Sequence, residues 1–190
     1  MDSSAHEHKT FEKLIYSGKE VKNKEFEQCT FKDCDLSDGL FLNNRFTECV
    51  FMGCNLSMTK LAGSSLRDVI FKQCKLLGVN FSECEDFLFS VRFENCILDY
   101  ASFMKKKMTK TKFVNTSLKQ VAFTGANLSN AVFDNCDLAD AIFNGTDLKE
   151  ADFRTANNYV IDPELNAIKK AKFSLYGIVG LLTKYGINVE

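Results

Sequence analysis

An apolar residue recurs at every fifth position along most of this chain, and that spacing limits the possible folds more than any other sequence feature. A period of five matches neither the 3.6-residue turn of a helix nor the two-residue alternation of a flat strand. It is typical of a chain that turns a corner after every five residues. The first run of the series ends where Asp86 occupies the expected place, and it reads Phe11, Tyr16, Val21, Phe26, Phe31, Leu36, Phe41, Phe46, Phe51, Leu56, Leu61, Leu66, Phe71, Leu76 and Phe81.

Residues twenty apart indicate how many corners make one coil. The five-residue register resumes two residues late, at Leu88. If this slip is counted as a two-residue insertion, apolar residues again recur at twenty-residue intervals on every side. One series then consists of Phe alone: Phe11, Phe31, Phe51, Phe71, Phe93, Phe113, Phe133 and Phe153. A ten-residue repeat would give a similar alternation of Phe and Leu, but ten residues are too few to enclose a packed core. The sequence therefore predicts an all-β solenoid whose coils have four sides.

The residue two positions before each apolar centre is small, as at Cys34, Ala126 and Thr146. Both positions share one side of a pleated segment, so both side chains are expected to point inward. The units Ala126–Asn130, Cys136–Asp140 and Ala151–Thr155 resemble the A-(D/N)-L-X-X unit of pentapeptide-repeat proteins. The resemblance implies a right-handed quadrilateral β-helix. It covers roughly residues 26–155, with an N-terminal tail and irregular first coil over 1–25.

Cysteine occupies the small inward position repeatedly, and the chain has eight of them. A metal ladder or a set of disulfides is one interpretation, and small apolar filling in place of Ala is the other. Parallel side chains at strand spacing are poorly placed for disulfides, no CxxC motif occurs, and both His lie in the first eight residues, which we expect to be mobile. We therefore expect core filling, free thiols, and no metal or cofactor. Eight free thiols also suggest a reducing compartment.

The slip over residues 82–90 is the first place to look for function, because departures from a regular repeat mark functional positions. Phe87 and Phe89 flank Leu88, which the register places inside. At least one of the two Phe side chains is then expected at the surface, as a contact for a partner. The alternative is that the spare Phe only folds over the surface.

A lysine cluster follows one coil later, and we take Lys105, Lys107 and Lys110 as candidate partner-binding residues. Nucleic-acid binding is one interpretation of such a cluster. The other pairs Lys105 with Glu83 and Lys107 with Glu85 across neighbouring coils. The cluster lacks interleaved aromatic residues for stacking on bases, so no direct contact with nucleic acid is expected.

Acidic residues gather on the last coils, at Asp134, Asp137, Asp140, Asp147, Glu150 and Asp152. Some pentapeptide-repeat proteins are thought to mimic DNA with such carboxylates. The repeat unit itself favours Asp or Asn, however, so scattered acids are also expected without any such role.

The C-terminal residues 159–190 read as a helical cap after a solenoid over 26–158. Asp162 and Pro163 suit the start of a helix over 164–172, Ser174 suits the start of a second helix, and Gly186 suits its end. Residues 187–189 are expected to form a short strand. The second helix has more apolar residues than one coil end can cover, so we predict a homodimer interface formed by Leu175, Ile178, Val179, Leu182 and Tyr185.

The overall charge of −1, from 24 basic and 25 acidic residues, gives no general attraction to nucleic acid or to an anionic membrane. No signal peptide or membrane span is expected, which favours the cytoplasm. No nucleophile, base and orienting group can be assembled into an active site, so we expect neither an enzyme nor a small-molecule substrate.

Among pentapeptide-repeat proteins, the mid-chain slip and the helical C-terminal module look like the Qnr-type group. That resemblance implies a dimer that binds a type II topoisomerase, DNA gyrase or topoisomerase IV, and protects it from quinolones or similar toxins. The chain departs from several Qnr proteins because it lacks long inserted loops. A scaffold with an unrelated partner and a DNA-mimicking topoisomerase inhibitor remain alternatives.

Overall fold

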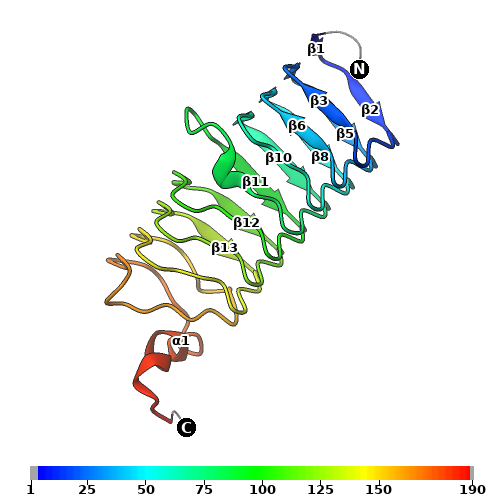
Figure 1. Cartoon of the computed structure of the whole chain (residues 1–190). Coiled ribbons are helices and arrows are strands. Elements are labelled where there is room, and N and C mark those ends of the chain that lie inside the picture. The colour runs from blue at the N-terminus through cyan, green and yellow to red at the C-terminus, as the bar shows by residue number, and fades with distance from the viewer. Residues whose placement is uncertain (1–3, 189–190) are drawn as a thin grey trace.

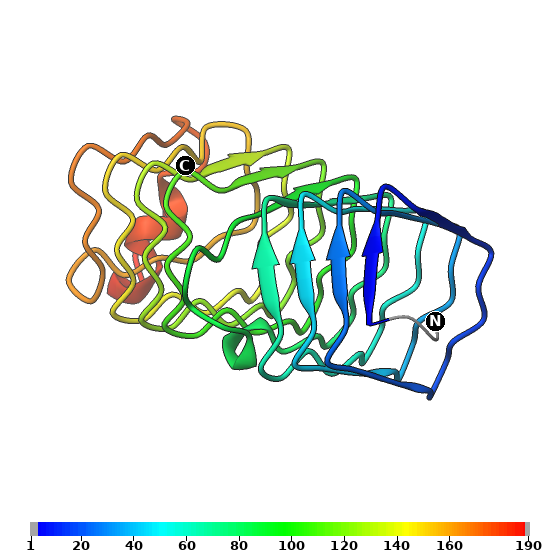
Figure 2. The same cartoon turned by 90° about the horizontal axis from the view of Figure 1, so that it is seen from above.

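The computed structural model describes residues 4–188 and consists of one rod of stacked coils, with β1 (Ala5–Glu7) at one end of the rod and α1 (Val179–Leu182) at the other (Figure 1). Figure 2 shows, from above, the coils following one another along the rod. Residues paired on neighbouring coils are twenty apart, and a corner occurs about every five residues, so each coil has four sides. The right-handed quadrilateral β-helix expected from the sequence is confirmed.

The strands are short, and within residues 4–188 helical turns occur at the slip and in the C-terminal segment. The elements are β1 (Ala5–Glu7), β2 (Thr10–Glu12), β3 (Glu20–Lys22), β4 (Glu25–Glu27), β5 (Thr30–Lys32), β6 (Leu40–Leu42), β7 (Arg45–Thr47), β8 (Val50–Met52), β9 (Ser65–Arg67), β10 (Val69–Lys72), the 3₁₀ helix η1 (Phe81–Glu83), β11 (Val91–Glu94), β12 (Lys112–Val114), β13 (Val132–Asp134), α1 (Val179–Leu182) and the 3₁₀ helix η2 (Thr183–Tyr185).

The corners explain the period of five. Two residues after almost every apolar centre the backbone takes a left-handed conformation, with φ between 48° and 64° at the non-glycine residues. Glu83, in η1, and Thr155 are among the exceptions. Asn115, Asp33 and Gly53 are examples, and Asn, Asp and Gly tolerate this conformation better than other residues. One such residue in nearly every unit turns the chain, and the non-glycine corner side chains lie exposed outside the coil.

Parallel ladders join each coil to the next with a twenty-residue register. On the first face the ladder runs β2-β5-β8-β10-β11-β12-β13 without a break. Phe51 pairs with Phe71, and Phe71 pairs with Phe93, so the two extra residues between β10 and β11 leave this face in register. The series of Phe positions expected from the sequence is therefore one continuous side of the rod.

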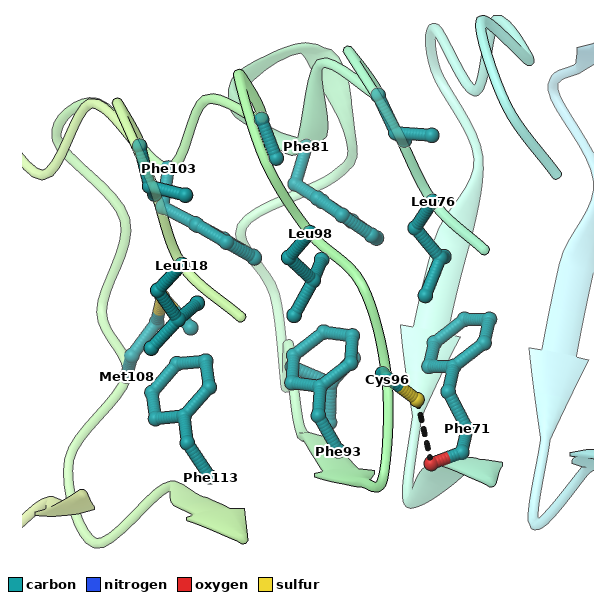
Figure 3. Close-up of a cluster of buried hydrophobic side chains, with 14 of the residues drawn as sticks. Phe71, Leu76, Phe81, Phe93, Cys96, Leu98, Phe103, Met108, Phe113 and Leu118 are labelled. Atoms are coloured by element: carbon teal, nitrogen blue, oxygen red, sulfur yellow. Dashed lines mark hydrogen bonds between the residues drawn. The ribbon is translucent and has the colours of Figure 1, made fainter. Parts of the chain in front are cut away.

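The aromatic rings of this series stack inside the rod (Figure 3). The ring centroids of Phe93 and Phe113 lie 5.4 Å apart, and those of Phe113 and Phe133 lie 5.0 Å apart, with nearly parallel planes. Phe103 on another side meets Phe113 edge-on at 6.3 Å. Stacked and edge-on contacts are both favourable arrangements of aromatic quadrupoles, so the rings fix the spacing of the coils as well as excluding water.

Side chains at the small inward position also form hydrogen bonds. At many of the positions held by Cys, Ser or Thr, the side chain donates to a backbone carbonyl of the preceding coil. Cys96 Sγ donates to the carbonyl oxygen of Phe71 at 3.4 Å (Figure 3). Thr59 and Ser64 make the same bond to Leu36 and Phe41 at 2.8 Å. The position therefore selects a small side chain, often one that can donate, which accounts for the mixture of Cys, Ser, Thr and Ala.

All eight cysteines are free and buried, as expected for core filling. Burial raises the pKa of Cys49, Cys84 and Cys136 to about 12. These thiols stay protonated at neutral pH, and a protonated buried thiol is a poor nucleophile.

The first coil is more regular than expected. His6 lies in β1, pairs in register with Phe26, and is buried against the Phe26 and Phe11 rings at 5.1 and 5.3 Å. The expectation that both His residues lie in a mobile segment is therefore wrong for His6. Burial lowers the pKa of His6, which keeps the imidazole neutral inside this aromatic stack.

The helix expected over 164–172 does not form. Ladder bridges instead continue from Asp147 to Ala167 and from Asp152 to Lys172, and Phe173 stacks on Phe153 at 5.4 Å. Asp162 Oδ1 accepts a hydrogen bond from the amide of Glu164 at 2.8 Å in a turn. Burial of apolar residues in register on the preceding coil outweighs the local helix signal here, because propensity is a weak influence beside packing.

The second C-terminal helix is confirmed in a shorter form, as α1 and η2. Ser174 Oγ accepts from the amide of Gly177 at 3.0 Å, and Gly186 ends the turn with φ 61°. Ile187 is not in a strand, and Val189 of the expected last strand lies outside the described residues.

Replacement of Phe113 tests the importance of the ring stack. We expect Phe113→Ala to reduce the free energy of unfolding by about 3–5 kcal/mol, because it leaves a cavity between two stacked rings. Lys75→Ala, at an exposed position on another face, is the control and is expected to change it by less than about 0.5 kcal/mol. Urea unfolding followed by circular dichroism measures both. Similar losses for the two variants would show that the stack does not carry the stability.

Candidate interaction surface

The fourth side of the rod is broken at the slip. Its ladder, β1-β4-β7-β9, ends at β9, and the next bridge on this side joins Lys107 to Asn127 two coils later. Between them η1 and the loop Asp86–Phe89 stand out from the regular coils, between β10 and β11 (Figure 1). The amides of Glu85 and Ser90 bond the carbonyls of Ser64 and Leu66 at 2.9 Å, so the loop is tied to β9 at both ends.

The loop reverses the predicted orientation of Leu88. Leu88 is 60% exposed with φ 57°, and Phe87 is 68% exposed, whereas Phe89 is half-buried against the core. The prediction that Leu88 points inward is therefore wrong. Leu88 adopts the left-handed conformation of the corner residues, which directs its side chain outward, and Phe89 takes the inner place instead.

Lys106 anchors this loop from the next coil, and sequence reasoning missed it. Its side chain is only 1% exposed, and Nζ donates to the carbonyl of Cys84 and to Asp86 Oδ1, the latter at 2.6 Å. The ammonium also lies 5.1 Å from the ring centroid of Phe89. A buried ammonium is tolerated only with such partners. The sequence did contain a signal for this burial: Lys106 stands two residues before the apolar centre Met108, at a position that is otherwise small and inward.

The expected pairs of Glu83 with Lys105 and of Glu85 with Lys107 are wrong. Neither occurs among the ion pairs formed by residues 4–188, and the contact between these coils is made by Lys106 and Asp86. Lys107 and Lys110 lie together beside the slip. Lys105 lies apart from them, at an exposed corner where its amide bonds the carbonyl of Thr124.

A groove of about 540 Å³ runs along the corner between the fourth and first sides, where the broken ladder leaves space. We call it the corner groove. Sequence reasoning missed two of its cations, Arg67 and Arg92, because outward charges are common on every coil and only the fold brings these two together. Its lining residues are Thr47, Arg67, Asp68, Val69, Ile70, Leu88, Phe89, Ser90, Val91, Arg92, Lys107, Thr109, Lys110, Thr111 and Lys112.

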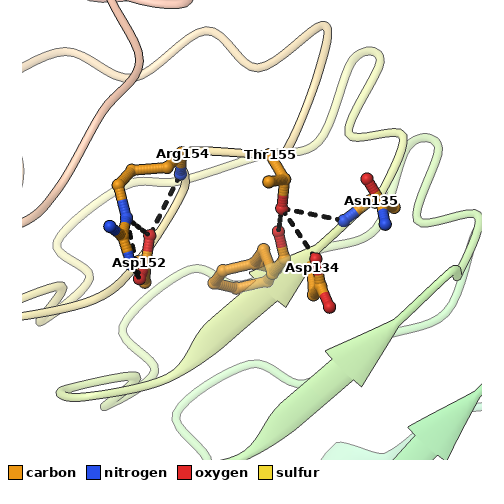
Figure 4. Close-up of polar contacts among 6 residues, drawn as sticks. Asp134, Asn135, Asp152, Arg154 and Thr155 are labelled. Carbon is orange, nitrogen blue, oxygen red and sulfur yellow. Dashed lines mark hydrogen bonds and ion pairs between the residues drawn. The ribbon is translucent and has the colours of Figure 1, made fainter.

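The acidic residues of the last coils are largely partnered within the chain. Arg154 Nη2 pairs with Asp152 at 2.7 Å, and Asp134 accepts from the Thr155 hydroxyl at 2.9 Å (Figure 4). Asp137 pairs with Lys119 at 3.2 Å. The hydrogen bond from Arg154 holds the pKa of Asp152 below its usual value. Carboxylates neutralised in this way imitate the uniform charge of a duplex poorly.

The C-terminal segment closes one end of the rod. Ile161 donates its amide to the carbonyl of Gly180 at 3.0 Å, and Leu181 is buried against the core. Lys184 binds Asp162 and Glu164 at 2.8 and 2.7 Å. The hydrogen bond from Lys184 keeps the pKa of Asp162 below its usual value. These contacts are those of a cap that covers the otherwise open coil.

The residues predicted to form a dimer interface lie on the outer side of this cap. Leu175 is 83% exposed, Ile178, Val179 and Tyr185 are exposed, and Leu182 is half-buried. The cap therefore leaves a cluster of apolar side chains facing away from the last coil.

Neither a membrane-spanning helix nor a metal cluster is found in the described part of the chain. Within residues 4–188 no helix has the length and apolar character needed to cross a bilayer. Over the same residues, no three His, Cys, Asp or Glu side chains converge as they would around a metal ion.

Four-sided coils with a left-handed corner at every fifth residue define a solenoid of pentapeptide repeats. The profile of the pentapeptide repeat region matches residues 24–103 and 86–157, more than half of the chain. The chain belongs to the pentapeptide repeat family.

Solved structures extend the comparison to the whole rod. The chain is similar to full-length QnrB1, a plasmid-mediated fluoroquinolone resistance protein, with a TM-score of 0.63 and 19% sequence identity over 96% of this chain and 100% of that one. A trypsin-treated QnrB1 variant gives a TM-score of 0.50 and 21% identity over 95% and 100% of the two chains. No curated protein sequence matches at a significant level. At these identities the likeness concerns the fold.

Replacement of Lys106 tests its role as the anchor of the loop. We expect Lys106→Met to speed hydrogen exchange at the amides of Phe89 and Ser90 at least about tenfold. The Cys84 carbonyl and Asp86 lose their donor, and hydrogen bonds to charged groups contribute about 1.5–3 kcal/mol. Lys105→Met, at the exposed neighbouring position, is the control and should leave these amides unchanged. Native-state exchange followed by mass spectrometry makes the comparison, and equal rates in both variants would contradict the anchoring role.

Proposed function

We propose that this protein is a non-enzymatic, cytoplasmic binding protein that acts as a homodimer on a type II topoisomerase, DNA gyrase or topoisomerase IV, and protects it from quinolones or similar toxins. The observation that carries the proposal is the fold match to QnrB1 along nearly the whole length of both chains. The match covers 96% of this chain and 100% of that one, so it extends over the whole rod rather than a few repeats.

The loop and its surroundings support a contact with a protein partner. Phe87 and Leu88 are large apolar side chains that remain mostly exposed, and Arg67 lies over the Phe87 ring at 5.1 Å. Aromatic and arginine side chains are enriched among the residues that contribute most binding energy at interfaces. We propose Phe87, Lys107 and Lys110 as contacts for the partner. Phe89, which supports the loop from beneath, and Lys105, at a separate exposed corner, complete the proposed partner-binding set.

The outer side of the cap supports the homodimer. Leu175, Ile178, Val179, Leu182 and Tyr185 provide apolar surface that the cap does not use to cover the coil. Pairing of two caps about a two-fold axis would bury this surface and double the length of the rod. Two symmetric copies of the loop would then suit a partner that is itself two-fold symmetric.

A supercoiling assay with purified DNA gyrase and a quinolone tests the proposed function. We expect the protein to restore supercoiling in the presence of the drug and to leave the drug-free reaction unchanged. Phe87→Ser is expected to raise the concentration needed for protection about tenfold, because exposed aromatic anchors dominate binding. Ile15→Ser, which changes an exposed apolar residue of the first coil, is the control. Inhibition of the drug-free reaction would support a DNA mimic, and no effect in either reaction would support a scaffold for another partner.

Sedimentation equilibrium tests the dimer. Wild type is expected to sediment at twice the 21.5 kDa mass of one chain. Leu175→Asp combined with Ile178→Asp should give a folded monomer, because coils depend only on their neighbours and buried carboxylates oppose association. Ile142→Asp, at an exposed apolar position on the coils, should remain a dimer. A monomeric wild type, or a double variant that still dimerises, would reject this interface.

A further inference from the structure

The corner groove combines unbalanced positive charge with exposed apolar surface. Arg67, Arg92, Lys107, Lys110 and Lys112 line it, with Asp68 as the only carboxylate. Asp68 Oδ1 already accepts a hydrogen bond from Ser90 Oγ at 2.8 Å. None of the five cations forms an ion pair within the part of the chain that the structure describes. A net charge of −1 for the whole chain makes this local excess distinct.

The ladder register is what gathers these cations. Arg92 on β11 and Lys112 on β12 occupy equivalent outward positions of successive coils on the first side. Arg67 on β9, Lys107 and Lys110 approach from the broken fourth side. Like charges at this spacing repel one another, and bound carboxylates relieve that repulsion. Arg67 Nε is also buried without a hydrogen-bond partner among the described residues.

Apolar side chains make up the rest of the groove lining beside these cations, Asp68 and a few Ser and Thr residues. Val69 and Val91 are buried beneath it, Phe89 is half-buried, and Leu88 stands 60% exposed on its rim beside Phe87. A ligand that fits both features carries carboxylates together with at least one large apolar side chain. An acidic stretch of polypeptide has that chemistry.

We propose that the corner groove binds an acidic, extended segment of a protein partner, whose carboxylates contact the five cations and whose apolar side chain packs on Phe87 and Leu88. This deepens the proposed function, since it names what a topoisomerase must offer at this surface, and it rests on that function only for the identity of the partner. Nucleic acid fits less well. One face of the Phe87 ring is covered by Arg67, and the cations do not continue along the rod as a phosphate backbone would require.

Fluorescence anisotropy with a labelled peptide of alternating Glu, Asp and Leu tests the proposal on the full-length protein. The comparison ligands are the same peptide with Gln and Asn in place of the acids, and a short DNA duplex. The acidic peptide is expected to bind more tightly than either comparison ligand. Its affinity should fall as the salt concentration rises, because salt screens exposed charges. Tighter binding of the duplex, or equal binding of the neutral peptide, overturns the proposal.

Charge reversal at two groove cations supplies the matched variants. The double variant Arg92→Glu with Lys110→Glu is expected to lower the affinity for the acidic peptide at least about tenfold. Its affinity should also depend less on salt concentration. Lys60→Glu with Lys75→Glu makes the same change of charge at exposed positions outside the groove and should alter the affinity less than about twofold. Phe87→Ser should weaken binding several-fold while leaving the salt dependence unchanged. Equal effects of the two charge reversals overturn the assignment to the groove.

The same variants separate this proposal from the proposed function. Groove-dependent peptide binding by a protein that never protects gyrase would support the groove and reject the topoisomerase. Gyrase protection that survives the Arg92 and Lys110 reversal would support the topoisomerase and reject the groove as its binding site. Thermal melts confirm that each variant remains folded, as expected for exposed side chains without ion pairs.

Discussion

The parallel hydrogen-bond ladder between residues twenty apart is the constraint on which the rest of this structure depends. A ladder of this kind places equivalent positions directly above one another, as Phe93, Phe113 and Phe133 are placed. The same residue type can then recur at one position of every coil, because an aromatic ring that packs in the core of one coil packs equally well in the next. The left-handed corner residues serve this ladder, because they turn the chain from one side of the coil onto the next.

The same constraint explains why two extra residues produce a surface feature. Neighbouring strands cannot shift by two residues on all four sides at once without losing the aromatic stack. The first side keeps its register across the insertion, with Phe71 paired to Phe93, and the whole displacement is taken up on the fourth side. Both the loop and the corner groove result from this local interruption of the ladder. Lys106 ties the loop to the next coil, because its buried ammonium donates to the carbonyl of Cys84 and to Asp86.

The surfaces that we propose for binding lie where the repeat stops being regular. The coils supply a rigid support, with stacked aromatic rings and buried free thiols in the core. The break supplies exposed Phe87 and the cations of the corner groove, and the C-terminal cap supplies a second apolar surface at the end of the rod. A rigid support carrying a few irregular features is a common arrangement for binding proteins, because preorganised contacts lose little entropy on association.

The sequence by itself determined the solenoid, the four-sided coil, the two-residue slip and the inward Phe and Cys positions, because each follows from a spacing that can be counted. It also placed Gly186 at the end of the last helical turn. Only the tertiary structure decided which way Leu88 points, that Lys106 is buried, and that Ile168 and Phe173 continue the coil in place of a helix. It alone brought Arg67 and Arg92 beside Lys107 and Lys110. These outcomes depend on competition between local preference and packing on the neighbouring coil, and that neighbour lies about twenty residues away in the sequence.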